Sequence, residues 1–224
     1  MLTEEISMSG FDAVWIDMEH TAIGKAEVLQ NLIAVRAGGA YSFVRIPWND
    51  AVQAKPIIDM GTDAIIFPYV RSAEEAEYAD GIRGYGPLRA GDYGGISQTE
   101  YVDRRFRDML RIIQIEHIDA VNDLERIAAV KGIDGFIVGP NDLSGSVGHI
   151  GRPNHPDMMP VYDRIGKILT GTGKLFGVSL GFDAEVIGQW LSRGVNTVFT
   201  GTDVEYIRAG VTSTFERLSA LVGK

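Results

Sequence analysis

The stretch LRIIQIEHIDAVNDLERIAAVKGIDGFIVGPND, residues 110–142, decides the fold class of this chain. It opens with a continuous apolar run at 110–116 and closes with a second one at 134–140. Between them, residues 119–132 place apolar side chains at helical spacing and end at Gly132, a residue type that favours helix termination. Apolar runs without polar alternation are typical of strands covered on both faces, so the stretch predicts a strand–helix–strand unit of a parallel sheet.

The same pattern repeats in both directions along the chain. Further strands are predicted at 12–17, 41–46, 63–70, 175–180 and 196–201. Further helices are predicted at 25–39, 72–80 and 182–194. Alternating strands and helices indicate an α/β fold with a parallel sheet, and a (β/α)8 TIM barrel suits a chain of this length. Seven strands are counted instead of eight, which leaves two interpretations: an open sheet, or a barrel whose first strand is missing from this chain.

The composition fits one domain over residues 1–224 and narrows the class of protein. Hydrophobic residues make up 45% of the chain, enough for a large core. The net charge of −9, without a basic stripe, argues against a nucleic-acid partner. No apolar run approaches the roughly 20 residues of a membrane span, and the first residues lack the pattern of a signal peptide. Because cysteine is also absent, we expect a soluble, cytoplasmic protein without disulfides or thiolate metal sites.

Acidic residues stand at the ends of two predicted strands. Glu116 ends the 110–116 strand, and Asp142 follows the next strand. Ligands of α/β barrels bind at the carboxyl ends of the strands, where these carboxylates could converge on a hard divalent cation such as Mg²⁺ or Mn²⁺. An α-keto acid could chelate such a cation, which would polarise the keto oxygen. The alternative is structural, with Asp142 capping a helix and Glu116 in a surface ion pair.

A basic residue and a histidine complete the candidate chemistry. Arg45 lies in an apolar strand, and a buried arginine needs an anionic or carbonyl partner. It could hold a substrate carboxylate or stabilise an enolate, or form an internal ion pair, for example with Asp59; both can hold at once. His20 closes the segment WIDMEH, residues 15–20. An imidazole near Asp17 and Glu19 is consistent with a general base oriented by a carboxylate, and the alternative is a histidine that caps the next helix.

Together these residues resemble the HpcH/HpaI aldolase/citrate lyase family, the class II 2-oxo-acid aldolases. The resemblance covers nearly the whole chain and is carried by GFDAVWIDMEHTA (10–22), VRIPWND (44–50), IIDMGTDAIIFPYVRSAEEA (57–76), GIRGYGPLRAGDYG (81–94), IQIEHIDAVNDLERIAAVKGIDGFIVGPNDLSGSVG (113–148) and TVFTGTD (197–203). It implies a TIM barrel of the phosphoenolpyruvate/pyruvate type. It also implies a metal-dependent aldolase that cleaves 4-hydroxy-2-oxo acids, such as 2-keto-3-deoxy sugar acids, to pyruvate and an aldehyde.

The resemblance assigns roles to residues by position. Glu116 and Asp142 would bind the divalent metal, which would be Mg²⁺, Mn²⁺ or Co²⁺. His20, oriented by Asp17, would be the catalytic base. Arg45, supported by Asp59, would bind the keto or enolate oxygen. The pyruvate pocket would be lined by Arg45, Gln114, Gly139, Asn141 and Asp142.

Other reactions and an assembly also follow from the resemblance. Oxaloacetate decarboxylation, or cleavage of an acyl-CoA ester as in the citrate-lyase-like relatives, would use the same enolate. A non-catalytic keto-acid-binding protein is an alternative of another class. A homo-oligomer, a trimer or hexamer, is implied, with the helix at 203–224 exchanged between subunits; packing against its own barrel is the alternative. The chain departs from the family in lacking its first strand and several residues usual between Asp80 and Gly81.

Overall fold

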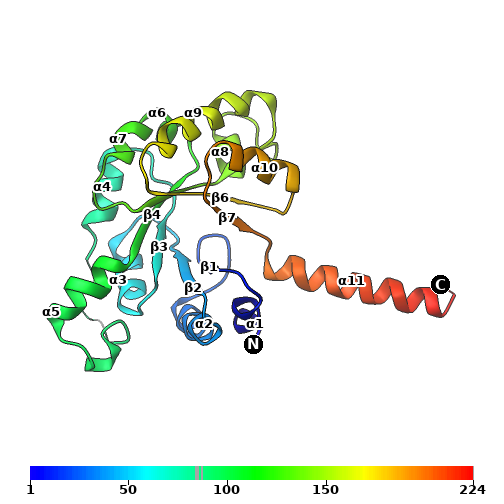
Figure 1. Cartoon of the computed structure of the whole chain (residues 1–224), viewed down its shortest axis with the longest axis horizontal. Coiled ribbons are helices and arrows are strands. Elements are labelled where there is room, and N and C mark those ends of the chain that lie inside the picture. Colours follow the sequence, from blue (N-terminus) through cyan, green and yellow to red (C-terminus); the bar gives the residue numbers. More distant parts are fainter. Residues whose placement is uncertain (84–85, 87, 224) are drawn as a thin grey trace.

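The computed structural model describes residues 1–83, 86 and 88–223. The segment 81–94, one of those that carry the resemblance to the family, therefore includes three residues outside the described ones: 84, 85 and 87. Within the described part, seven parallel strands follow one another in chain order and curl into a nearly closed barrel (Figure 1). The strands are β1 (Ala13–Asp17), β2 (Tyr41–Arg45), β3 (Ala64–Phe67), β4 (Leu110–Ile115), β5 (Gly135–Val138), β6 (Leu175–Leu180) and β7 (Thr197–Thr200). The predicted strands are confirmed, as is a TIM-type barrel with one strand fewer than eight.

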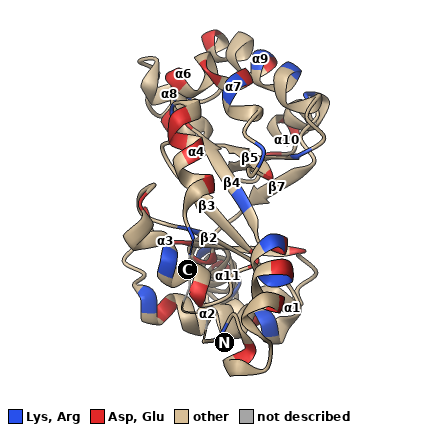
Figure 2. Cartoon of the chain, turned by 90° about the vertical axis from the view of Figure 1, so that its left-hand side faces the viewer, with Lys and Arg blue, Asp and Glu red and all other residues tan. Residues whose placement is uncertain are grey.

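The helices lie outside the barrel (Figure 1). They are α1 (Leu2–Met8), α2 (Lys25–Gly38), α3 (Ala51–Asp59), α4 (Ala73–Gly81), α5 (Gln98–Glu100), α6 (Ile118–Asn122), α7 (Leu124–Ala128), α8 (Pro140–Ser146), α9 (Met159–Thr170), α10 (Ala184–Ser192) and α11 (Asp203–Leu221). Short 3-10 helices η1 (Asp92–Gly94) and η3 (Pro156–Met158) and a π-helix η2 (Tyr101–Phe106) complete the described elements. Basic and acidic residues are interspersed along the helices (Figure 2). None of the described helices has the length and apolar character needed to cross a membrane.

Local signals explain most helix boundaries. The Ser72 side chain caps α4, as its capping-box spacing predicts. α2 ends at Gly39, which has the left-handed φ of 85° that glycine tolerates. The prediction of one helix over 119–132 is wrong, because the backbone leaves helical geometry at Asp123 and gives two short helices, α6 and α7. The carboxylate of Asp123 instead accepts the N–H of Ala73 at 2.8 Å and ties this turn to the start of α4.

Two cores hold the barrel together. Outward-facing strand residues pack against the helices in one large core. Inward-facing residues fill the barrel in a smaller core centred on Phe43, Ile66, Ile112 and Ile137. Since successive side chains of a strand point to opposite faces, this register also fixes which polar residues point inward.

Among the described residues, no strand lies between β1 and β7, the two edges of the sheet. Aromatic side chains contact each other across the interior at this point: the ring of Phe199 lies 5.1 Å from Trp15 and 5.2 Å from Phe43. Side-chain packing therefore joins the first and last strands where backbone hydrogen bonds join all the others.

α11 projects from the barrel as an isolated helix (Figure 1). None of its residues is buried, although it carries apolar side chains at helical spacing. Ile207, Val211, Phe215 and Leu218 are all more than half exposed. The alternative that this helix packs against its own barrel is therefore wrong, and its apolar stripe has no partner within the described residues.

Candidate active site

Inward-pointing polar residues meet at the carboxyl ends of the strands. Because the side chains of Phe43 and Ile112 point into the barrel, Arg45 and Gln114, two positions further along the same strands, do so as well. Glu116 follows Gln114 at the next inward position, just past β4. The strand register thus places these groups side by side, as the sequence analysis predicts.

Arg45 is 7% exposed and is held by acceptors from neighbouring strands. Its Nε and Nη2 donate to the two carboxylate oxygens of Asp17, at 2.8 and 2.6 Å. Its Nη1 donates to Oε1 of Gln114 at 3.2 Å and lies 2.9 Å from Oε2 of Glu19. The two-pronged bond to Asp17 fixes the guanidinium plane, so Nη1 is the donor that a substrate oxygen can share.

The Asp17–Arg45 pair is charged at neutral pH. Burial alone would raise the pKa of Asp17, but the hydrogen bond and charge of Arg45 outweigh burial and hold this pKa below its usual value. Burial would likewise lower the pKa of Arg45, and the interactions with Asp17 outweigh it and raise that pKa. The guanidinium of Arg45 is therefore charged and held in a fixed position in the interior of the barrel.

Glu116 is 3% exposed and lies beside this ion pair. Its Oε1 accepts the N–H of Tyr69 at 2.6 Å, and its Oε2 accepts a hydrogen bond from Nε2 of Gln114. Burial raises the pKa of Glu116 to about 8, and the negative charge of Glu19 adds to the effect. A metal ligand must be deprotonated, so a cation bound here would displace the proton.

The turn between β5 and α8 packs its backbone against these groups. A Cβ on Gly139 would lie 2.9 Å from Nε2 of Gln114 and 3.2 Å from Cβ of Glu116, so the close approach requires glycine. Asn141 and Asp142 follow in the first turn of α8, both exposed. Gly139 thus lies against the buried acid, while Asn141 and Asp142 lie at the mouth.

His20 is also at the mouth, with a side chain that is 58% exposed. Its Nε2 lies 3.8 Å from Oε2 of Glu19 and 4.0 Å from Oδ2 of Asp142. The resemblance implies that Asp17 orients the imidazole, and in the structure both carboxylate oxygens of Asp17 bind Arg45. Glu19 and Asp142 are the carboxylates that lie nearest to the ring.

Asp59 does not belong to this site. Its Oδ1 accepts the N–H of Gly86 at 3.2 Å, and its backbone oxygen accepts the N–H of Ala90. The predicted support of Arg45 by Asp59 is therefore wrong. The physical reason is the direction of α3, which runs back along the barrel after β2, so that its last residue lies near the amino ends of the strands.

Glu19, which the sequence analysis names only as a carboxylate beside His20, also lies next to Arg45. Its side chain is 16% exposed, next to Arg45 and His20. Burial raises its pKa, although the charges of Arg45 and His20 oppose the shift.

Three carboxylates, those of Glu19, Glu116 and Asp142, belong to this site, but their oxygens do not all lie within 4.8 Å of one another. The negative charges of Glu19 and Asp142 both raise the pKa of Glu116, and Oε2 of Glu19, which makes no hydrogen bond, lies 2.9 Å from Nη1 of Arg45. A cation would offset this repulsion, and hard cations take carboxylate and water oxygens. Binding of such an ion by Glu116 and Asp142 stays a prediction.

A second group of metal-binding residue types lies in the loop after α8. Ligand atoms of His149, His155 and Asp157 lie within 4.8 Å of one another. The imidazole rings stack, however, with centroids 3.8 Å apart and an angle of 16° between their planes. A metal binds an imidazole nitrogen in the plane of the ring, and stacked rings share no such point. Nε2 of His149 instead lies 3.0 Å from the Asp157 carboxylate, and this interaction stabilises the loop conformation.

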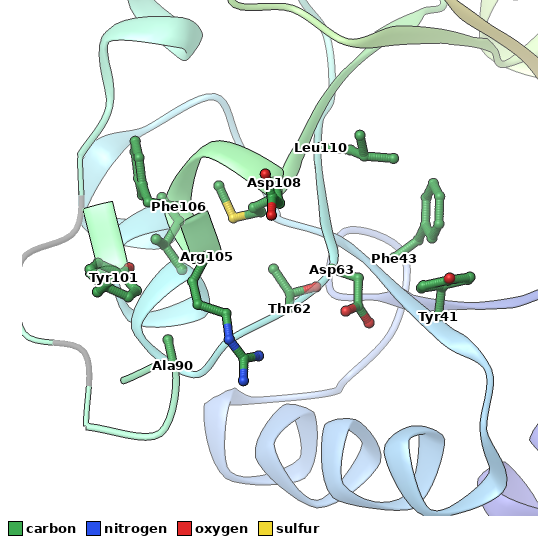
Figure 3. Close-up of a pocket in the computed structure, with 13 residues that line it drawn as sticks. Tyr41, Phe43, Thr62, Asp63, Ala90, Tyr101, Arg105, Phe106, Asp108 and Leu110 are labelled. Carbon is green, nitrogen blue, oxygen red and sulfur yellow. The ribbon is translucent and has the colours of Figure 1, made fainter. Parts of the chain in front are cut away.

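A pocket of about 410 Å³ lies at the other end of the barrel, by the amino ends of β2, β3 and β4 (Figure 3). Its lining is largely apolar. Its charged groups are already paired, since Asp63 accepts two hydrogen bonds from Ser42 and Arg105 binds Asp92 at 2.8 Å. None of the candidate catalytic side chains lines this pocket, so it is separate from the candidate active site.

Comparisons with known proteins find similar sequences and a similar fold. The sequence model of the HpcH/HpaI aldolase/citrate lyase family matches residues 1–209. A hydroxypyruvate/pyruvate aldolase of Sagittula stellata is 37% identical over 183 residues, covering 78% of this chain and 69% of that protein. A 5-keto-4-deoxy-D-glucarate aldolase of Shigella dysenteriae is 30% identical over 216 residues, covering 92% and 83% of the two chains. The crystal structure of an HpcH/HpaI aldolase of Desulfitobacterium hafniense superposes with a TM-score of 0.87 at 27% identity, covering 97% of this chain and 87% of that one.

Proposed function

The chain belongs to the HpcH/HpaI aldolase/citrate lyase family and is an enzyme of the aldehyde-lyase type, and from this premise we propose how its active site works. The substrate is a 4-hydroxy-2-oxo acid, and the products are pyruvate and an aldehyde. The observation that carries the proposal is the guanidinium of Arg45, held by Asp17 beside the buried carboxylate of Glu116. This arrangement provides a fixed positive charge next to a cation-binding carboxylate.

Glu116 and Asp142 would hold the divalent metal, Mg²⁺, Mn²⁺ or Co²⁺. When bound, such an ion supplies Lewis-acid stabilisation of negative charge on the keto oxygen of the pyruvyl group. Nη1 of Arg45 donates a hydrogen bond to the same oxygen. Because Asp17 fixes the guanidinium beforehand, this donor needs no reorganisation as the charge develops.

The cleavage moves one proton and one electron pair. His20 takes the proton of the C4 hydroxyl, the C3–C4 bond breaks, and its electron pair passes into the pyruvyl half as the enolate. The C4 fragment leaves as an aldehyde, and the proton held by His20 returns through water to C3 of the enolate, which gives pyruvate and restores the neutral imidazole. The nearby Glu19 and Asp142 carboxylates stabilise the imidazolium that forms on His20.

Glu116→Gln tests this proposal directly. The variant keeps the size of the side chain and removes the metal-binding charge, so metal-stimulated cleavage of 4-hydroxy-2-oxo acids should be lost. Release of pyruvate is measured across a titration with Mg²⁺, Mn²⁺ and Co²⁺. Glu125→Gln, an exposed position on α7, is the matched control and should behave like the wild type. Metal-stimulated activity that persists in Glu116→Gln would refute the proposal.

Oxaloacetate decarboxylation is tested in the same experiment because it needs only the pyruvyl half of the site. Measuring it beside aldol cleavage separates an aldolase from a decarboxylase. Pyruvate and metal binding without turnover of any substrate would instead support a non-catalytic binder. A cytoplasmic location and a trimeric or hexameric assembly remain predictions from the sequence.

A further inference from the structure

Three side chains that follow β2 and β3 lie together beside the candidate active site: Trp48, Tyr69 and Arg71. We call this group of side chains the β3 rim. The Trp48 ring lies 5.4 Å from the Tyr69 ring, and the Arg71 guanidinium lies 5.0 Å above it. The mechanism described above uses none of these side chains.

Tyr69 connects the β3 rim to the metal-binding acid. Its backbone N–H bonds to Glu116, and its ring lies 5.6 Å from that of His117, the residue after Glu116. Tyr69 also has a φ of 54°, an uncommon left-handed conformation for a residue other than glycine. Such backbone strain clusters at ligand sites, where the surrounding structure maintains it.

Arg71 has donors that the protein does not satisfy. Its Nε is buried and has no hydrogen-bond partner. Its Nη2 lies 3.6 Å from Oε1 of Glu75, beyond hydrogen-bonding distance, while Oε2 of Glu75 accepts the backbone N–H of Arg71. The side chain of Arg71 is 41% exposed, so a ligand can reach it. A guanidinium stacked on an aromatic ring with unused donors is suited to bind a carboxylate in a two-pronged manner.

We propose that Arg71, supported by Tyr69 and Trp48, binds a carboxylate at the far end of the aldehyde half of the substrate and so selects aldehyde acids over uncharged aldehydes. This inference rests on the proposed function, because the pyruvyl half must first occupy the site formed by Arg45 and Glu116. Arg71 contacts Glu116 only through Tyr69, whose ring lies under the guanidinium and whose backbone N–H binds Glu116, so we place the carboxylate beyond the carbon that carries the new hydroxyl. One guanidinium next to Glu75 matches a single negative charge better than a phosphate dianion.

The test compares two aldehydes of equal length in the aldol direction, with pyruvate as the donor. One is 4-oxobutanoate, which ends in a carboxylate, and the other is butanal. The wild type should prefer 4-oxobutanoate. Arg71→Gln should lower kcat/KM for 4-oxobutanoate about ten- to hundredfold, mainly through KM, the range expected for a hydrogen bond to a charged group. It should change kcat/KM for butanal less than about twofold. Arg71→Lys, which keeps the charge, should recover part of the preference.

Controls distinguish the possible failures. Arg126→Gln removes an exposed arginine of α7 that pairs with Glu74, and it should leave both aldehydes unaffected. An equal preference for both aldehydes in the wild type, or a preference unchanged in Arg71→Gln, would overturn the inference. Hydrogen–deuterium exchange at the pyruvate methyl group reports the pyruvyl half alone. Exchange without the expected aldehyde preference refutes only the role of Arg71, whereas no exchange and no aldol product refute the proposed function and this inference with it.

Discussion

Burial of Glu116 gives the metal-free protein a stability that falls as the pH rises. Its pKa is about 8 in the folded protein, against a usual value of 4.5 that the unfolded chain recovers. Between these values the folded state holds more protons than the unfolded state, so the free energy of unfolding decreases with increasing pH. Urea denaturation with a chelator present should show this decrease from about pH 5 to pH 8.

Two variants check the origin of that pH dependence. Glu116→Gln cannot titrate and should remove the contribution, giving a flatter profile. Glu125→Gln should retain the wild-type slope. If the free energy of unfolding of the wild type rises with pH over this range, the raised pKa of Glu116 is contradicted. Saturating divalent metal should make the wild-type slope shallower, because a bound ion keeps Glu116 deprotonated.

Asp17→Asn tests the positioning of Arg45. The amide keeps one acceptor but loses the charge and the two-pronged carboxylate bond, so the guanidinium becomes less well fixed. We expect kcat to fall by about a hundredfold with a smaller change in KM, since the lost interaction matters most when charge develops. The free energy of unfolding should fall by about 1–3 kcal/mol, measured by denaturant titration. A variant with wild-type kcat would show that Arg45 needs no such support.

At the scale of single residues, the sequence predicts which side chains converge but not how they pair. Arg45, Gln114 and Glu116 follow from strand ends and alternation, both visible in the sequence. The choice of Asp17 as the partner of Arg45, in place of Asp59, depends on the direction in which α3 leaves the site. That direction is a property of the folded chain, as is the exposure of His20.

The elements themselves are largely predictable. Continuous apolar runs mark every strand of the barrel, because strands buried on both faces leave no polar alternation. The break between α6 and α7 could not be predicted, because it depends on the contact of Asp123 with Ala73, a residue far away in the sequence. Helical spacing alone continues through that position.

Gly135→Ala tests how tightly the strands pack inside the barrel. An added Cβ would lie 2.6 Å from Cβ of Leu175 and 2.9 Å from its carbonyl oxygen, so β5 or β6 must shift. We expect a loss of about 1–3 kcal/mol in the free energy of unfolding, measured by thermal or urea denaturation. Gly188→Ala in α10 meets no atom within 4 Å and is the matched control. It should stabilise the protein by up to about 1 kcal/mol, and similar effects of both variants would contradict the tight packing at β5.

At the scale of the whole molecule, α11 predicts self-association. Its apolar stripe is exposed, and a second copy of the chain is the partner that the sequence analysis predicts. Phe215→Glu places a charge in the middle of the stripe and should reduce the mass of the assembly measured by light scattering. Ser213→Glu, exposed on another side of the helix, should leave the assembly intact. A wild-type protein that is monomeric at micromolar concentration would contradict this role of α11.

The overall architecture was predictable only in part. Repeated strand–helix units indicate a parallel barrel, and counting them gives seven strands. Whether seven strands leave an open sheet or a nearly closed barrel depends on the curvature of the sheet, and no local pattern in the sequence encodes it. In the structure, the contact of Phe199 with Trp15 and Phe43 shows that the first and last strands approach each other, as in a nearly closed barrel.

That aromatic contact also provides an optical probe. The indole of Trp15 lies edge-on to Phe199, at the junction of the first and last strands. Its fluorescence emission therefore depends on whether β1 and β7 are in contact or separated. In a variant with Trp48→Phe and Trp190→Phe, which leaves Trp15 as the single tryptophan, a red shift before the loss of helical circular dichroism would show that unfolding begins where β1 meets β7.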